Sequence, residues 1–301
     1  MHLRELFNQH RTTFSFEFFP PKSSEAAEEL FASIAALVPL KPTFVSVTYG
    51  AGGTTRELTH DLVVRLKKET TLDPVAHLTG VGHSEKDIEA ILRRYSTAKI
   101  SNILALRGDA PKAAGTEGEF KHAVDLVKFI KGFNERHATA KNKGFGIAVA
   151  GYPEGHPGTP NRLVEMDHLK AKVEAGADAI VTQLFFDNRD FLDFRDRCRI
   201  AGIRVPIVAG IMPVTSISGL KRIVELAAGA RVPASLLRAL ARAEASPEGV
   251  RRVGQHWATE QCRDLLDHGV DGIHLYTLNK STATREIYAT LGVEDSHGLA
   301  S

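Results

Sequence analysis

The sequence predicts an α/β protein with a closed (β/α)8 barrel, a TIM barrel, and extra helices inserted before the last strand. Three observations predict this fold. Strand and helix patterns alternate about eight times, and the 301 residues suit a fold that typically needs roughly 250. Polar residues recur at alternate positions or at the carboxyl ends of several strands, whereas an open doubly wound sheet needs central strands that are apolar on both faces. We expect one barrel domain over residues 1–301.

The composition excludes several classes of protein. Lys and Arg number 38 against 36 Asp and Glu, so no basic surface for a nucleic-acid partner is expected. Cys198 and Cys262 lie far apart without a CxxC motif, which fits a reducing compartment better than disulfides or a cysteine zinc site. Charges interrupt the amino-terminal segment, and no apolar run approaches membrane-spanning length. We therefore expect a soluble, cytoplasmic protein with no membrane partner.

The expected strands are short and end at turn-forming or polar residues. The first falls within residues 12–19, where Phe14, Phe16 and Phe18 share one face, and Pro20 with Pro21 ends it because proline supplies no backbone donor. The other expected strands cover residues 43–49, 74–79, 100–106, 145–150, 179–184, 205–211 and 272–277.

The expected helices lie between these strands. Ser84 and Asp87 suggest a capping arrangement at the start of one helix. Thr159 and Pro160 look like the N-cap and first residue of another helix, which ends near residue 175. Further helices are expected at residues 23–38, up to about 68, and at 119–137, 233–243, 247–268 and 281–291. Three glycines lie just past a helix, where the left-handed conformation is expected: Gly176, Gly202 and Gly269.

Glu17 lies at the carboxyl end of the first strand, on the face that it shares with Ser15. A carboxylate flanked by phenylalanines is expected to be partly desolvated, and desolvation favours the protonated form that a general acid needs. A glutamate on an edge strand that reaches water is an equally good interpretation of this segment alone.

The carboxyl ends of all strands share one face of such a barrel, and that face carries the site. The polar residues at these ends are Glu17, Thr48, Tyr49, His77, Arg107, Asp109, Tyr152, Gln183 and Tyr276. They include no nucleophile beside a base and no metal-ligand spacing, so no metal is expected, and the lone histidines are more often structural. The set predicts a site for a polar, aromatic organic molecule.

Two short motifs have competing interpretations. The segment 50–53, Gly-Ala-Gly-Gly, lacks the remaining residues of a dinucleotide or phosphate loop and is interpreted as a tight strand-to-helix turn. Arg107 is suited to bidentate contact with a phosphate, and a salt bridge between neighbouring strand ends is about as good an interpretation.

The eight strand ends carry, in order, FSFEFFPPK, FVSVTYGAGG, AHLT, LALRGD, GYPEGHP, TQLFFD, GIMPV and LYTLNK. Each motif is weak alone, but the ordered set covers nearly the whole chain and resembles the methylenetetrahydrofolate reductase family, in its short bacterial form without a regulatory domain. The resemblance implies an FAD-dependent flavoprotein oxidoreductase of one-carbon metabolism and methionine biosynthesis. NADH or NADPH would reduce the flavin and leave before 5,10-methylenetetrahydrofolate is reduced to 5-methyltetrahydrofolate at the same flavin face. It also suggests a homo-oligomer.

The resemblance further implies roles for single residues. Glu17 would be the general acid that helps open the five-membered ring of the folate to an iminium, Asp109 would favour that cation by its charge, and Gln183 would hydrogen-bond the pterin. Other positions implied to contact folate or nicotinamide are Gly219, Ile223 and Lys280. The positions implied to contact FAD are Thr48, Tyr49, His77, Arg107, Gly108, Asp109, His122, Ala123, Ala150, Tyr152, His156, Glu165, His168 and Lys172.

The chain departs from the familiar bacterial pattern at some of these positions. The departures are His122 for a tyrosine, His168 and Ala171 for Asn and Arg, Gly219 and Ile223 for Gln and Phe, and Lys280 for Arg. The changes at Gly219 and Ile223 motivate an alternative, a catalytically silent flavin- or folate-binding subunit of a larger one-carbon complex. A Schiff-base aldolase would need a lysine inside the barrel, and no expected strand supplies one.

Overall fold

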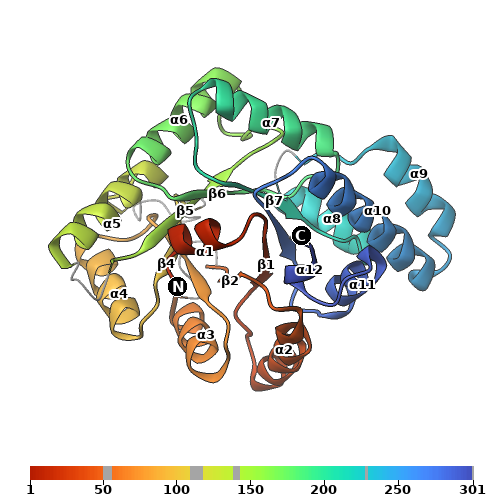
Figure 1. Ribbon diagram of the computed structural model, residues 1–301, viewed down its shortest axis with the longest axis horizontal. Helices are drawn as coiled ribbons and strands as arrows, with labels where there is room; N and C mark the ends of the chain where they lie inside the picture. The colour runs from red at the N-terminus through yellow and green to blue at the C-terminus, as the bar shows by residue number, and fades with distance from the viewer. Residues whose placement is uncertain (50–55, 109–117, 138–142, 228–229, 300–301) are drawn as a thin grey trace.

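A closed barrel of parallel strands forms the centre of the molecule, which confirms the predicted (β/α)8 fold (Figure 1). The computed structural model describes residues 1–49, 56–108, 118–137, 143–227 and 230–299. Each strand pairs with the next in the sequence, and β8 returns to pair with β1. The strands are β1 Thr13–Phe18, β2 Phe44–Val47, β3 Pro74–Thr79, β4 Asn102–Leu106, β5 Gly146–Gly151, β6 Ala179–Thr182, β7 Ile207–Ile211 and β8 Gly272–Tyr276.

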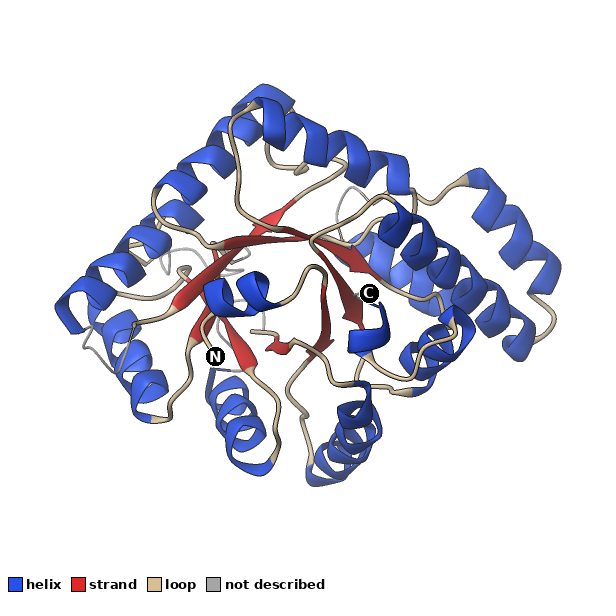
Figure 2. Cartoon of the chain, viewed as in Figure 1, coloured by secondary structure: helices blue, strands red, loops and turns tan. Residues whose placement is uncertain are grey.

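The structure contains helices, most of which surround the barrel on its outer side (Figure 2). They are α1 Leu3–Gln9, α2 Ser24–Leu37, the 3-10 helix η1 Val38–Leu40, α3 Arg56–Glu69, α4 Glu85–Thr97, α5 Ala123–His137, α6 Arg162–Glu174, α7 Asn188–Ile200, α8 Ile217–Leu226, α9 Ala234–Ala243, α10 Pro247–Asp267, α11 Thr282–Leu291 and α12 Ser296–Leu299.

The local signals at several helix ends are confirmed. The Ser84 hydroxyl accepts the backbone N–H of Asp87, and the Asp87 carboxylate accepts that of Ser84, which completes a capping box at α4. Gly176, Gly202 and Gly269 have φ angles of 114°, 85° and 60°, so all three take the left-handed conformation expected after a helix.

The predicted start of α6 is wrong. Its N-cap is Asn161, whose side-chain oxygen accepts two backbone N–H groups of the first turn. Thr159 lies earlier, in a turn where its own backbone N–H donates to the carbonyl of His156 at 2.9 Å. Thr159 and Pro160 therefore precede the helix, because the asparagine beyond them caps two donors at once.

The alternation along β1 separates an outer apolar face from an inner polar one. Phe14 and Phe16 each pack edge-on against Tyr288 of α11, with ring centroids 6.1 Å apart, inside the core between strands and helices. Ser15 and Glu17 face the inside of the barrel. The surroundings of the Glu17 carboxylate therefore come from other strands rather than from the flanking phenylalanines.

Helix α1, which the sequence analysis did not predict, lies across one end of the barrel (Figure 1). Leu3 and Leu6 are almost fully buried against inward-facing apolar residues such as Phe44 and Val208. The backbone N–H of Leu3 donates to the Asn102 side chain at 2.8 Å. The helix thus supplies an apolar floor to the barrel interior.

The extra helices expected before the last strand are present as α9 and α10, and α8, which the sequence analysis did not predict, lies with them on one side of the barrel (Figure 1). They enclose a second apolar cluster that contains Leu184, Met212, Leu236 and Leu240. This cluster joins the insertion to the ends of β6 and β7.

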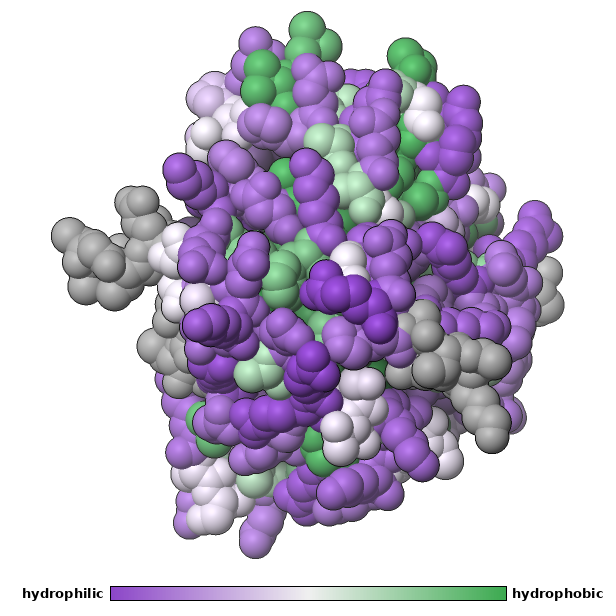
Figure 3. Space-filling model, turned by 90° about the vertical axis from the view of Figure 1, so that its left-hand side faces the viewer, coloured by the Kyte–Doolittle hydropathy of each residue, from purple (hydrophilic) through white to green (hydrophobic). Residues whose placement is uncertain are grey.

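The side of the molecule that carries α4, α5 and α6 is mostly hydrophilic, and its apolar side chains form small, separate groups (Figure 3). Among the described helices, none combines the length and the apolar character that crossing a membrane requires.

Candidate active site

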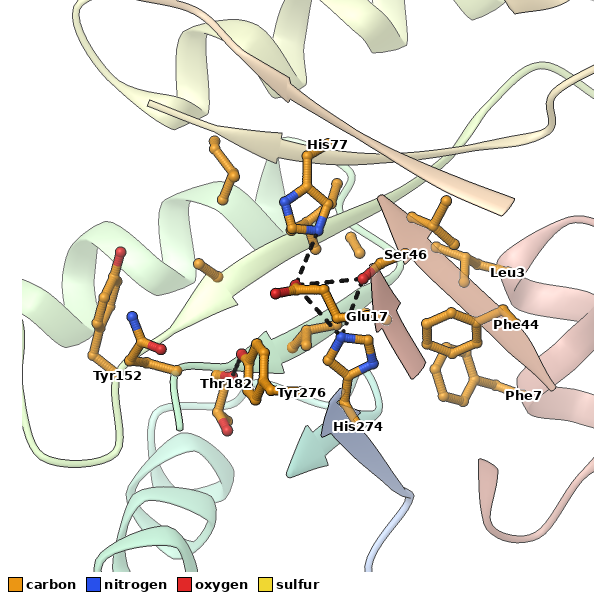
Figure 4. Close-up of a pocket in the computed structure, with 18 residues that line it drawn as sticks. Leu3, Phe7, Glu17, Phe44, Ser46, His77, Tyr152, Thr182, His274 and Tyr276 are labelled. Carbon is orange, nitrogen blue, oxygen red and sulfur yellow. Dashed lines mark hydrogen bonds and ion pairs between the residues drawn. The ribbon is translucent and has the colours of Figure 1, made fainter. Parts of the chain in front are cut away.

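A cavity of about 250 Å3 lies inside the barrel and extends toward the carboxyl ends of the strands (Figure 4). Leu3 and Phe7 of α1 line it together with Phe44. The polar residues that line it are Glu17, Ser46, His77, Tyr152, Thr182, Gln183, His274 and Tyr276. The cavity therefore has an apolar floor and a polar wall that is built from many strands.

Glu17 projects into this cavity among three polar side chains (Figure 4). Its Oε2 atom accepts a hydrogen bond from the Ser46 hydroxyl at 3.4 Å and lies 3.5 Å from His77 Nε2 and 3.7 Å from His274 Nε2. The side chain is 16% exposed. Because a closed barrel has no sheet edge, the edge-strand interpretation of Glu17 does not apply.

His77 presents a neutral ring to Glu17. Burial lowers the pKa of His77 to about 4, although the neighbouring Glu17 carboxylate opposes the shift. At neutral pH the contact between His77 and Glu17 is therefore not an ion pair. The two side chains can share a hydrogen bond while the His77 ring stays uncharged.

Gln183 follows β6 directly and has a defined orientation. Its side-chain oxygen accepts the backbone N–H of Leu184 at 2.9 Å, and its own backbone N–H donates to the Gly151 carbonyl at 2.8 Å. Among the described residues, none accepts a hydrogen bond from the amide Nε2 of Gln183, so this group can donate to a ligand.

The end of β5 and helix α6 form a second group of polar residues. The Lys172 ammonium donates to the Ala150 carbonyl at 2.7 Å, and burial lowers the pKa of Lys172 to about 8, against the opposing effect of Glu165. Burial raises the pKa of Glu165, whose carboxylate accepts the backbone N–H of His156. The rings of Tyr152 and His156 meet edge to face with centroids 4.7 Å apart. These contacts join five residues into one continuous patch: Ala150, Tyr152, His156, Glu165 and Lys172.

The remaining positions implied to contact FAD are arranged around this patch in different ways. The rings of His122 and His168 lie 6.4 Å apart, with Ala123 opening α5 beside His122. Arg107 is exposed at the end of β4, and Gly108 has a φ of 86°. The part of the chain that the structure describes provides no ion-pair partner for Arg107.

Thr48 and Tyr49 follow β2 and make different contacts. The Thr48 carbonyl accepts a hydrogen bond from the Thr59 hydroxyl at 3.0 Å. Tyr49 is buried, and its hydroxyl lies 3.2 Å from His83 Nε2, while His83 Nδ1 lies 2.9 Å from the Val81 carbonyl. Tyr49 therefore contacts the base of the neighbouring loop.

The positions implied to contact folate or nicotinamide are spread over a wider area. Gly219 and Ile223 lie on α8, where the backbone N–H of Gly219 donates to the Ser216 hydroxyl at 3.0 Å. Ile223 packs against the second apolar cluster. Lys280 is exposed just beyond β8.

Asp109 and the Gly-Ala-Gly-Gly segment at 50–53 lie outside the described residues. The role of Asp109 and the interpretation of the segment as a turn stay predictions. In the described ranges, no group of three or more His, Cys, Asp or Glu residues could hold a metal ion.

Sequence reasoning did not place Ser15 and Thr182 in the site. Ser15 lies 2.7 Å from His274 Nδ1, and the Thr182 carbonyl accepts the Tyr276 hydroxyl at 2.8 Å. For Ser15 the available signal was the alternation that puts it on the same face as Glu17.

Polar side chains gather at the carboxyl ends of the barrel strands. This arrangement is typical of (β/α)8-barrel enzymes. The chain belongs to the methylenetetrahydrofolate reductase family, whose model matches residues 2–292.

Individual relatives agree with this assignment. Methylenetetrahydrofolate reductase (NADH) 1 of Arabidopsis thaliana is 40% identical over 99% of this chain and 51% of the plant protein. The 5,10-methylenetetrahydrofolate reductase of Escherichia coli K12 is 38% identical over 95% of this chain and 92% of the bacterial protein. The chain thus spans about half the length of the plant relative and most of the bacterial one.

A solved structure supports the fold. A Clostridium thermocellum protein described as binding two copies of 5-methyl-5,6,7,8-tetrahydrofolic acid superposes with a TM-score of 0.68, over 97% of this chain and 99% of that one. Its sequence identity is 14%, so the likeness concerns the barrel alone.

Proposed function

We propose that the protein reduces 5,10-methylenetetrahydrofolate to 5-methyltetrahydrofolate, with FAD bound at the barrel mouth and NADH or NADPH as the electron donor. The observation that carries the proposal is the position of Glu17. Its carboxyl group points into a cavity of the barrel in a chain whose family match extends over residues 2–292.

The polar patch on β5 and α6 fits a flavin dinucleotide by the chemistry of its donors. FAD carries an anionic diphosphate and a planar ring with several hydrogen-bond acceptors. Lys172 directs one of its three donors to Ala150, which leaves two donors, and Arg107 presents an exposed guanidinium at the next strand end. The residues that would hold the cofactor are Lys172, Arg107, His156 and His168. When bound, FAD supplies the ring that accepts electrons from a nicotinamide and delivers them to the folate.

Glu17 would act on the folate as a proton donor. As the five-membered ring of the substrate opens, the proton of the Glu17 carboxyl group goes to the departing ring nitrogen, and the carbon left behind becomes an iminium. Gln183 would donate its amide N–H to an acceptor on the pterin, which orients that ring over the cavity. The neutral ring of His77 would border the site without adding a cation that repels the iminium.

The flavin spectrum of the purified, FAD-reconstituted protein tests this proposal. Separate anaerobic titrations with NADH and NADPH should bleach the flavin absorbance with at least one donor and show which donor is preferred. Addition of 5,10-methylenetetrahydrofolate should then restore the oxidised spectrum. A protein that binds no flavin after reconstitution would overturn the proposal.

The silent-subunit alternative predicts a different result in the same experiment. Its flavin would stay oxidised with both nicotinamides and would be reduced only when a partner protein is added. Sedimentation of the same sample would test the homo-oligomer that the resemblance suggests.

A further inference from the structure

A buried chain of hydrogen-bonding groups runs from Glu17 to the inside of the barrel. Glu17 Oε2 lies 3.4 Å from the Ser46 hydroxyl, which lies 3.1 Å from His274 Nε2. On the other side of the ring, His274 Nδ1 lies 2.7 Å from the Ser15 hydroxyl. His274 is 1% exposed, so its two ring nitrogens depend on these two serines for partners.

All hydrogen bonds of this series run in one direction when Glu17 is a carboxylate. Ser46 must then donate to Glu17, so its oxygen accepts a proton from His274 Nε2–H. His274 Nδ1 is consequently unprotonated and accepts the hydroxyl proton of Ser15. Every donor in the chain points toward the negative charge.

The chain reverses when Glu17 is a carboxylic acid. The acid O–H can donate to Ser46, and Ser46 can donate to His274 Nε2, which leaves the ring proton on Nδ1. His274 Nδ1–H then donates to Ser15, whose own proton needs a new acceptor. The Ile273 carbonyl oxygen lies 3.5 Å from the Ser15 hydroxyl and provides it.

We propose that His274 is a positioning residue for Glu17. Its ring proton lies on Nε2 when Glu17 is a carboxylate and on Nδ1 when Glu17 is a carboxylic acid, and the two arrangements differ by the one proton that Glu17 takes up from water. The same four side chains, with the Ile273 carbonyl as an acceptor in the acid state, satisfy both states, so neither state leaves a buried donor or acceptor unpaired. A general acid must be held equally well before and after it gives up its proton, and this chain provides both arrangements.

The other groups that face Glu17 do not offer this reversal. His77, from β3, lies 3.5 Å from the same carboxylate oxygen, and burial holds its pKa at about 4. Tyr276, from β8, has its hydroxyl directed to the Thr182 carbonyl. Burial, with a further effect of Glu17, raises the pKa of Tyr276 well above its usual value, so the phenol keeps its proton.

The tautomer can be measured directly by 15N NMR of histidine-labelled protein during a pH titration. We expect the two ring nitrogens of His274 to exchange their protonated and unprotonated signals when the side-chain 13C signal of Glu17 changes from that of the carboxylate to that of the carboxylic acid. His274 with one unchanged tautomer through that titration would overturn the proposal, and so would an imidazolium signal with both nitrogens protonated. This measurement needs only the folded protein and does not depend on the proposed reaction.

Ser15→Ala provides the variant test, because it removes the partner of Nδ1–H and the path to the Ile273 carbonyl. The ring should then keep its proton on Nε2 at every pH. Ser24→Ala, at an exposed position of α2, is the matched control and should keep the tautomer change of the wild type.

The role of this hydrogen-bond chain in catalysis rests on the proposed function and is measured separately. In Ser15→Ala, the alkaline limb of the pH profile for flavin reoxidation by folate should shift to lower pH by about one unit. The cause is the loss of one hydrogen bond that supports the protonated form. Flavin reduction by the nicotinamide should not change. An equal loss of both half-reactions at every pH would show a purely structural role. A protein that changes tautomer but reduces no folate would contradict the proposed function alone.

Discussion

The Tyr276 hydroxyl, on β8, donates a hydrogen bond to the backbone carbonyl of Thr182, on β6, at 2.8 Å. The bond passes over β7, the strand between them, at Gly210. The backbone N–H of Gly210 in turn donates to the Thr182 hydroxyl at 2.9 Å. Three neighbouring strand ends are thus tied together beside Glu17, and the aromatic ring fits only because residue 210 has no side chain.

Gly210→Ala should therefore destabilise the protein. An added Cβ would lie 2.5 Å from the Thr182 carbonyl oxygen and 2.8 Å from Cε2 of Tyr276, and backbone atoms cannot move aside cheaply. We expect the free energy of unfolding to fall by about 1–3 kcal/mol in urea denaturation. The control is Gly132→Ala on α5, where the nearest atom is the end of the Arg136 side chain at 3.2 Å. Wild-type stability in Gly210→Ala would mean that the ring does not lie over this residue.

Glu17→Gln should separate the two half-reactions of the proposed enzyme. Reduction of the flavin by the nicotinamide needs no proton from this side chain and should be largely retained. Transfer to the folate should slow by about 10²–10⁴-fold, the usual contribution of a general acid. Stopped-flow absorbance of each half-reaction measures both rates, with Glu28→Gln at an exposed position of α2 as the control. Equal losses in both would identify Glu17 as structural.

His77 should make the protein less stable in acid. Its pKa is about 6.5 in the unfolded chain and about 4 in the folded one, so between these values the unfolded state binds more protons. Stability is therefore lost as the pH falls from 6.5 toward 4. His77→Gln should reduce that loss by at most about 3 kcal/mol, measured by urea denaturation at the two ends of the range.

The control for this prediction is His256→Gln, at an exposed position of α10. It should lose stability in acid as the wild type does. If His77→Gln and His256→Gln behaved alike, burial of the His77 ring would not be the cause of the acid sensitivity.

Leu3→Ala should weaken the floor of the barrel. The side chain is 1% exposed and packs with the inward-facing apolar residues. Its truncation leaves a cavity, and we expect a cost of about 2–5 kcal/mol in the free energy of unfolding. Leu237→Ala, at a side chain that is 48% exposed on α9, should cost much less in the same urea denaturation. Similar costs for the two variants would show that α1 does not contribute to the core.

The barrel could be predicted from the sequence because each strand-helix unit carries its own signals. The capping box at Ser84 and the glycine after α6, Gly176, act over a few residues and can be interpreted without the rest of the fold. Helix α1 also has a capping box, but its N-cap is His2, a residue type that does not mark a helix start in the sequence. Seven residues are too few to form a stable helix alone, and Leu3 and Leu6 acquire their role only against the barrel floor.

The site could be predicted only in part, for a similar reason. The end of β1 indicates Glu17 directly, since proline stops the strand just beyond it. The partners of Glu17 depend on which strands become neighbours. Ser15 and His274 are 259 residues apart, and only closure of β1 on β8 brings them together. The resemblance likewise implies an FAD contact for Tyr49, but the contact of Tyr49 with His83 arises from the packing of two loops.

The pairing of β1 with β8 has a consequence for biosynthesis. A ribosome completes β1 before any other strand, yet the nascent chain cannot supply its second neighbour until β8 has left the exit tunnel. Until then Glu17 has no contact with His274, and β1 lacks the strand that pairs with it on that side. The surroundings of Glu17 are therefore complete only after β8 has closed the barrel against β1.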